Sequence, residues 1–213
     1  MKSILTLGVI TFALTFCGLG DRLKQMSGST NSSSSNSSSS SNGSTKSGET
    51  SVEKPTLTSS QQSITDAATE TKWNEQGISW KLPSGWPKMQ VSKDSFNYGS
   101  PANGFLIASI SVMPDSFPAE ISINATYDAA LEQLKQSNYE KVRWLEIDGV
   151  KGVEWSEALK EKDGIRRHQW IAFRKYQGQN QQLNIIISTN GANFEKQKDA
   201  FAAIMYSMKI AKG

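Results

Sequence analysis

The sequence contains a single cysteine and a single histidine among 213 residues. One Cys cannot form a disulfide within a chain, and one Cys with one His cannot supply the ligand set of a Cys/His zinc site. Lys and Arg outnumber Asp and Glu by only 23 to 20, whereas a nucleic-acid-binding protein concentrates positive charge on one face. These shortages exclude a disulfide scaffold and a Cys/His metal centre, and they argue against nucleic acid as a partner.

Residues 1–17 have the pattern of a bacterial export signal. Lys2 gives a positive start, and residues 4–16 are apolar or small and carry no charge. A helix of this length spans about 20 Å, short of the roughly 30 Å hydrocarbon core of a membrane, which favours a signal peptide over a spanning helix. The run ends at Leu14-Thr15-Phe16-Cys17, which resembles the lipobox of bacterial lipoproteins. The resemblance implies that Cys17 is acylated, with palmitate for example, and becomes the mature amino terminus.

Phe16 departs from the lipobox pattern, which has Gly, Ala or Ser directly before the cysteine. Two alternatives remain open: ordinary secretion after cleavage at the small-x-small site of residues 18–20, and an uncleaved anchor. The position of the sole cysteine favours lipidation. We therefore expect a protein of the bacterial cell envelope, anchored through a lipid on Cys17 and facing the periplasm or the exterior.

Two further regions follow the signal segment. Residues 18–72 are rich in Ser, Gly and Asn, which bury too little apolar area to offset the entropy of ordering the backbone. We expect this region to be a disordered tether. All six Trp lie at or after Trp73, and residues 73–213 are long enough for one globular domain with one core.

Within residues 73–213 the hydrophobic pattern predicts strands joined by short turns. Helical spacing occurs at Tyr127–Leu134 and again at Phe194–Met208, and Asp148-Gly149 is a strong two-residue turn signal. The run at residues 105–113 is apolar on both faces, which predicts a central strand covered on both sides. Strand patterns occur at residues 78–82, 105–113, 142–147, 150–159, 165–176 and 183–189. Short connections favour antiparallel neighbours, so we expect an α+β fold with an antiparallel sheet of about six strands flanked by helices.

Three segments of this domain resemble PsbP-like and DcrB-like domains. Residues 80–86 resemble their opening strand with Leu-Pro and Gly-Trp, residues 147–153 their central hairpin, and residues 194–207 their closing helix. The resemblance implies an α/β/α sandwich around an antiparallel sheet, in a superfamily that includes a photosystem subunit and a Ran-binding import factor. Because the matching positions are structural, the resemblance carries over no catalytic residue.

His168 is the only imidazole of the chain and a conceivable general base, and it lies in a predicted strand. A nucleophilic triad needs a nucleophile beside the base, and neither a Gly-x-Ser-x-Gly elbow nor a cysteine is present in the domain. A strand histidine that faces solvent or bonds to a neighbour is the simpler interpretation. We expect no enzymatic activity, no cofactor and no metal site.

Trp144, Trp155 and Trp170 fall on adjacent predicted strands. They can pack across the sheet as cross-strand aromatic neighbours, or they can form an exposed aromatic binding surface. The expected function is a non-catalytic envelope module that binds a protein partner or assists assembly. The alternatives are a small-ligand or glycan binding module and, less favoured, a hydrolase.

Lipidation of Cys17 is directly testable. We expect cells that express the protein to incorporate an alkynyl palmitate analogue into it, and the Cys17→Ala variant to lose the label and leave the membrane fraction. A label that survives Cys17→Ala contradicts the assignment.

Overall fold

The computed structural model describes residues 51–158 and 164–211, so the signal run, Cys17 and most of the Ser-rich segment lie outside it. None of the helices in these two ranges is long and apolar enough to cross a membrane. The elements in chain order are α1 (Ser59–Ala67), β1 (Thr69–Trp73), the 3-10 turn η2 (Asn74–Gln76), β2 (Ile78–Leu82), β3 (Lys88–Val91), β4 (Ser95–Ser100), β5 (Gly104–Met113), α2 (Ala119–Lys135), β6 (Tyr139–Ile147), β7 (Val150–Glu157), β8 (Ile165–Tyr176), β9 (Gln179–Asn190), α3 (Gly191–Tyr206) and β10 (Lys209–Ile210).

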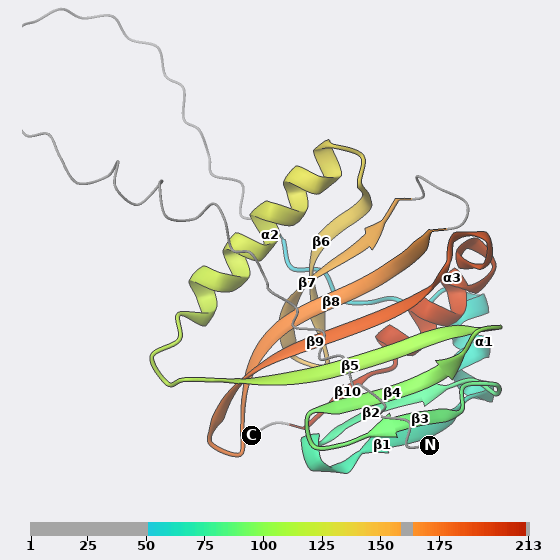
Figure 1. Cartoon of the computed structure of the whole chain (residues 1–213), viewed down its shortest axis with the longest axis horizontal. Helices are drawn as coiled ribbons and strands as arrows, with labels where there is room; N and C mark the ends of the chain where they lie inside the picture. The colour runs from blue at the N-terminus through green and yellow to red at the C-terminus, as the bar shows by residue number, and fades with distance from the viewer. Residues whose placement is uncertain (1–50, 159–163, 212–213) are drawn as a thin grey trace, which may run out of the picture. The chain divides into compact units, whose positions relative to one another are not determined.

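The strands form a seven-stranded sheet in the order β3-β4-β5-β9-β8-β7-β6 and a three-stranded sheet in the order β1-β2-β10 (Figure 1). Neighbouring strands in both sheets are antiparallel. The predicted α+β class with an antiparallel sheet is confirmed. The sequence pattern missed the β3–β4 hairpin, and it did not separate β2 from the main sheet. The hairpin was missed because β3 exposes most of its residues and so lacks a buried face. The second error arises because the alternation of β2 shows a strand but not its partners, β1 and β10.

Two tight turns fix the register of the sheet. Asp148 and Gly149 have φ values of 49° and 86°, the left-handed pair that a type I′ hairpin requires, which confirms the predicted turn. Gln177 and Gly178 repeat this geometry at 48° and 77°. The turn is only two residues long, so the strand predicted at residues 183–189 begins earlier, at Gln179.

One face of the seven-stranded sheet carries the main core. The helix α3 packs on β8 and β9 there, and the small sheet adds Ile78, Trp80 and Leu82 from β2. Trp80 stacks on Phe96 of β4 with ring centroids 4.7 Å apart. Every second residue of β9 points into this core, which is why the alternating pattern of Leu183 to Ile187 predicted a strand correctly.

The other face of the sheet is covered only in part. The helix α2 packs against β6, β7 and β8, beside which it lies in Figure 1. The prediction that residues 105–113 are covered on both sides is wrong, because Ile107 is 40% exposed. One helix is about 10 Å wide, too narrow to cover seven strands.

The folded region begins earlier than Trp73, within the segment for which we expected a tether. Thr58 caps α1, its side chain accepting from the Gln61 backbone while the Gln61 side chain accepts from the Thr58 backbone. Asp199 of α3 accepts hydrogen bonds from Ser60 (2.8 Å) and Gln61 (3.1 Å). Upstream, Glu53 forms a parallel bridge with Leu145 at the β6 edge.

Gly152 in β7 generates a test of the packing. A Cβ atom at this position would lie 2.6 Å from the indole of Trp170 and 2.5 Å from the Ile171 carbonyl oxygen. Valine favours strands, yet we expect Gly152→Val to lower the free energy of unfolding by about 2–3 kcal/mol because the core has no room.

The matched control is Lys175→Val at an exposed position of β8, for which we expect a change within about 0.5 kcal/mol. Urea unfolding measures both variants. Equal effects would contradict the steric account.

Candidate functional site

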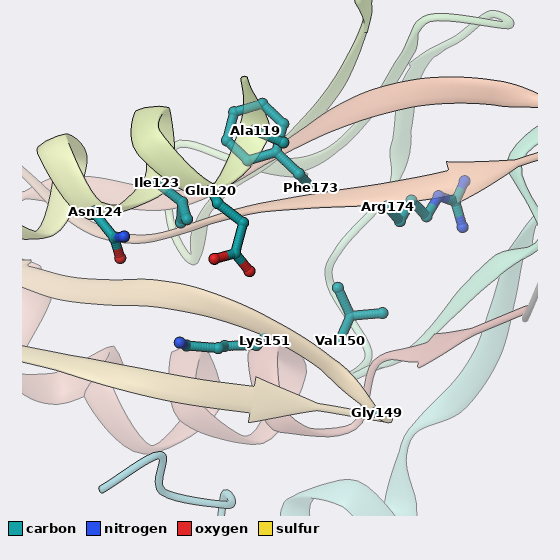
Figure 2. Close-up of a pocket in the computed structure, with 9 residues that line it drawn as sticks. All are labelled: Ala119, Glu120, Ile123, Asn124, Gly149, Val150, Lys151, Phe173 and Arg174. Carbon is teal, nitrogen blue, oxygen red and sulfur yellow. The ribbon is translucent and has the colours of Figure 1, made fainter. Parts of the chain in front are cut away.

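A cleft lies between the first two turns of α2 and the tip of the β6–β7 hairpin, with β8 along its side (Figure 2). Its volume is about 380 Å³, within the range of small-molecule sites in proteins. Figure 2 shows Glu120 and Ile123 pointing from α2 toward the hairpin that carries Val150 and Lys151. The cleft is therefore formed by side chains of three separate elements.

The cleft exists because α2 is anchored on either side of it. Before the helix begins, Phe117 packs on Phe173 of β8 with ring centroids 5.4 Å apart. Further along, Tyr127 stacks on Trp144 at 4.8 Å, and the buried Ala130 contributes to the same cluster. Its small side chain lets the helix approach the sheet closely.

The walls of the cleft combine apolar and polar groups. Ile123, Val150 and Phe173 are half-buried and supply apolar surface. Glu120 and Lys151 bring opposite charges to the rim, and the Lys151 ammonium lies 4.2 Å from the centroid of the Trp144 ring. Such a cleft suits a molecule with an apolar body and a polar end.

Arg174 also lines the cleft, but its guanidinium points away from the centre (Figure 2). It donates to the Gln76 carbonyl oxygen at 2.7 Å and to Gln181 Oε1 at 3.0 Å, both neutral acceptors. Burial lowers the pKa of Arg174 to about 10. Its role is to hold the turn at Gln76 against β8 and β9.

The three Trp residues singled out in the sequence do not form an exposed surface. Trp144 is 6% exposed and Trp155 is 7% exposed, and both lie on the α2 side of the sheet. Tyr127 stacks on Trp144, and Tyr139 stacks on Trp155. Trp170 is fully buried on the opposite face, and its indole donates to the Leu145 carbonyl oxygen. Helix α2 covers Trp144 and Trp155, and the main core takes up Trp170.

A buried polar cluster lies on the α3 side of the sheet, around Glu154. The Glu154 side chain is fully buried and accepts from Tyr206 (2.5 Å), from Arg143 (2.5 Å) and from Lys141 (3.0 Å). Its fourth contact is His168 Nε2 at 2.7 Å. Since an ionised carboxylate only accepts, Nε2 carries the proton in this contact.

The charges of this cluster stabilise one another. Burial opposes ionisation of Glu154, but the hydrogen bond and charge of His168, with Lys141 and Arg143, outweigh it and hold the pKa of Glu154 far below its usual range. Burial and the neighbouring Glu154 carboxylate raise the pKa of Tyr206 above its usual value. His168 is thus bonded to a neighbour, the simpler of the two interpretations, and its cluster ties α3 to β6, β7 and β8.

The residues of the cleft were not found by sequence reasoning. Ile123 lies on the same helix as Tyr127, so the helical pattern could have been extended toward it. Lys151 and Phe173 line the same cleft because β7 and β8 pair up to Gly152 and Ala172, the residues next to them. The Asp148-Gly149 turn was the available signal for the cleft floor, but it does not reveal where α2 docks.

The Glu154 cluster generates a prediction with a pH dependence. We expect Glu154→Gln to lower the free energy of unfolding by about 3 kcal/mol at pH 7, because it removes a fully buried carboxylate that Arg143 and Lys141 contact and leaves these partly buried cations without that counter-charge. Because the pKa of Glu154 is lower in the folded protein than in the unfolded chain, its ionisation stabilises the fold at pH values above the unfolded pKa of about 4.3. This stabilisation is lost as the pH falls below that value. The difference between wild type and variant should therefore shrink below about pH 4.

Glu53→Gln is the matched control, because Glu53 contacts the same Arg143 but its side chain is 52% exposed. We expect Glu53→Gln to lower the free energy of unfolding by less than about 1 kcal/mol. Urea unfolding at several pH values measures both, and a pH-independent gap for Glu154→Gln would contradict the account.

Comparison with known proteins gives only distant structural likeness. No model of a known protein family matches the chain, and no curated protein matches it in sequence. Among solved structures, it is similar to a Bacteroides thetaiotaomicron protein at 16% identity and a TM-score of 0.41, over 64% of this chain and 46% of that one. The match thus spans less than half the length of the Bacteroides protein.

Two further similar structures have descriptive names. Cyanobacterial PsbP (CyanoP) of Synechocystis sp. PCC 6803 matches at 14% identity and a TM-score of 0.43, over 68% of this chain and 94% of that one. LpqN, involved in cell envelope biogenesis of Mycobacterium tuberculosis, matches at 16% identity and a TM-score of 0.45, over 68% of this chain and 85% of that one. A PsbP structure is thus among the matches, but at these identities no residue role and no ligand is transferred to this chain.

Proposed function

We propose that this chain is a non-catalytic binding protein of the cell envelope whose folded region binds a small amphipathic molecule in the cleft beneath α2. The observation that carries the proposal is the cleft itself, with about 380 Å³ of space between apolar walls and a polar rim. Clefts of this size and lining are the usual sites of small ligands. In this proposal the apolar part of the ligand lies against Ile123, Val150 and Phe173.

The polar groups of the cleft support binding rather than catalysis. Glu120 is the only carboxylate among the residues that line the cleft, so the cleft does not contain the pair of carboxyl groups that glycosidase chemistry requires. His168, the one imidazole, belongs to the Glu154 cluster on the other face of the sheet. The cleft thus lacks a base and a nucleophile in contact with each other.

A small ligand is a better match to this surface than the protein partner favoured from sequence. Protein interfaces usually centre on exposed Trp, Tyr or Arg anchors, and Trp144, Trp155 and Trp170 are buried. Anchoring through a lipid on Cys17 remains part of the proposal. It would place the folded region at a membrane surface, where amphipathic molecules are concentrated.

Binding of a neutral apolar fluorophore tests the proposal. We expect N-phenyl-1-naphthylamine to bind the full-length mature protein with increased emission, and Ile123→Glu to weaken binding by about tenfold, because the variant places a charge in the apolar wall.

Ile121→Glu is the matched control, since Ile121 lies on the same helix, is 70% exposed and does not line the cleft. This variant should bind as wild type does. Thermal unfolding of both variants separates lost binding from lost folding. Absence of fluorophore binding to the wild type, or equal weakening in the two variants, would overturn the proposal.

A further inference from the structure

A second cavity lies on the α3 side of the seven-stranded sheet, next to the Glu154 cluster. Residues of α1, α3, β6, β7 and β8 line it, and its volume is about 380 Å³. Two of the lining residues, Glu140 and Lys198, are exposed, so the cavity is open to solvent. It shares no lining residue with the cleft beneath α2. The two are therefore separate sites.

The floor of this cavity is a row of three polar side chains on adjacent strands. The register places Ser156 of β7 directly opposite Lys141 of β6 on one side and His168 of β8 on the other. Residues opposite each other in antiparallel strands have side chains on the same face, with Cβ atoms about 5 Å apart. All three line the cavity, so a single small group can contact the whole row.

Each member of the row has hydrogen-bonding capacity that the fold does not use. Ser156 is 7% exposed, and its hydroxyl has no hydrogen-bond partner among the described residues. His168 is 6% exposed and donates from Nε2 to Glu154, while its Nδ1 has no partner within the same ranges. The Lys141 ammonium contacts Glu154 and Tyr206 there, so at least one of its three hydrogens remains available. Buried polar groups without partners are costly, and a ligand that bonds to them removes that cost.

The acceptor on His168 discriminates between kinds of ligand. Because Nε2 gives its hydrogen to the Glu154 carboxylate, Nδ1 of the neutral ring carries a lone pair and accepts. The Ser156 hydroxyl and the Lys141 ammonium beside it donate. The row thus matches a group that presents a hydroxyl and anionic oxygens side by side. Inorganic phosphate and the monoanion of a phosphate monoester have this combination, whereas sulfate and a carboxylate lack the hydroxyl at neutral pH.

The charges around the row favour an anion. The side chain of Arg143 is 19% exposed and that of Arg166 is 4% exposed. Of the carboxylates that contact these two arginines in the described part of the chain, only Glu154 is fully buried. The others are about half exposed, so water and salt screen their charge more strongly: Glu53 at 52%, Glu140 at 47% and Glu195 at 55%. The buried groups near the row thus have a net positive charge.

We propose that this cavity binds a hydrogen phosphate group, carried by free phosphate or by a phosphate monoester. The hydroxyl of the group donates to His168 Nδ1, and its anionic oxygens accept from the Ser156 hydroxyl and the Lys141 ammonium. Phe194 and Phe201 line another part of the cavity, where the organic part of a monoester has room. The proposal does not depend on the function proposed for the cleft beneath α2.

Isothermal titration calorimetry of the full-length mature protein with inorganic phosphate, glycerol 3-phosphate and sulfate tests the proposal at constant ionic strength. We expect both phosphate compounds to bind, and sulfate to bind at least about tenfold more weakly because it has no hydrogen to donate to Nδ1. Tighter binding of glycerol 3-phosphate would support the proposal with a monoester, such as a lipid headgroup, as the ligand. Tighter binding of inorganic phosphate would support it with free phosphate as the ligand.

Variants of the row test the assigned contacts. We expect Ser156→Ala and Lys141→Met each to weaken phosphate binding by about tenfold, because each removes a donor to an anionic oxygen. The matched control is Lys196→Met, since Lys196 is an exposed lysine of α3 that does not line the cavity. This variant and the cleft variant Ile123→Glu should bind phosphate as wild type does.

Thermal melts by circular dichroism establish that each variant is folded. The comparison of phosphate with sulfate needs no variant at all. Absence of phosphate binding to the wild type, equal binding of sulfate, or equal weakening in Lys196→Met would overturn the proposal.

Discussion

The structure depends on an imbalance between the two faces of its seven-stranded sheet. Six spacings between strands make the sheet about 29 Å wide, whereas a helix with its side chains is about 10–12 Å across. On one face α3 and the small sheet together enclose the main core. On the other face α2 alone packs on β6, β7 and β8. The cleft beneath α2 and the exposed side chain of Ile107 both lie on this incompletely covered face.

The enclosed face is held by charge as well as by apolar packing. Glu154 is buried where α3 crosses the sheet, and it joins groups from β6, β8 and α3 through Arg143, His168 and Tyr206. Arg143 also contacts Glu53, so the same cluster fixes the start of the folded region at the β6 edge.

The sequence predicted features with a local cause. The alternation of β2, the Asp148-Gly149 turn and the helical spacing around Tyr127 each depend on neighbouring residues. Prediction from the sequence failed for features that depend on residues far apart in the chain. The apolar pattern of Ile107 cannot indicate that α2 stops short of β5, and Trp144 gives no sign that Tyr127 covers it. The cleft requires that knowledge, so it was not predictable.

The central claim is that an amphipathic ligand binds on the α2 side of the sheet. Amide chemical-shift mapping of the ¹⁵N-labelled full-length protein with N-phenyl-1-naphthylamine tests it most directly. The account predicts shifts concentrated at the first two turns of α2, at residues 149–151 and at Phe173. Shifts concentrated instead at α1, α3 or the small sheet would contradict it.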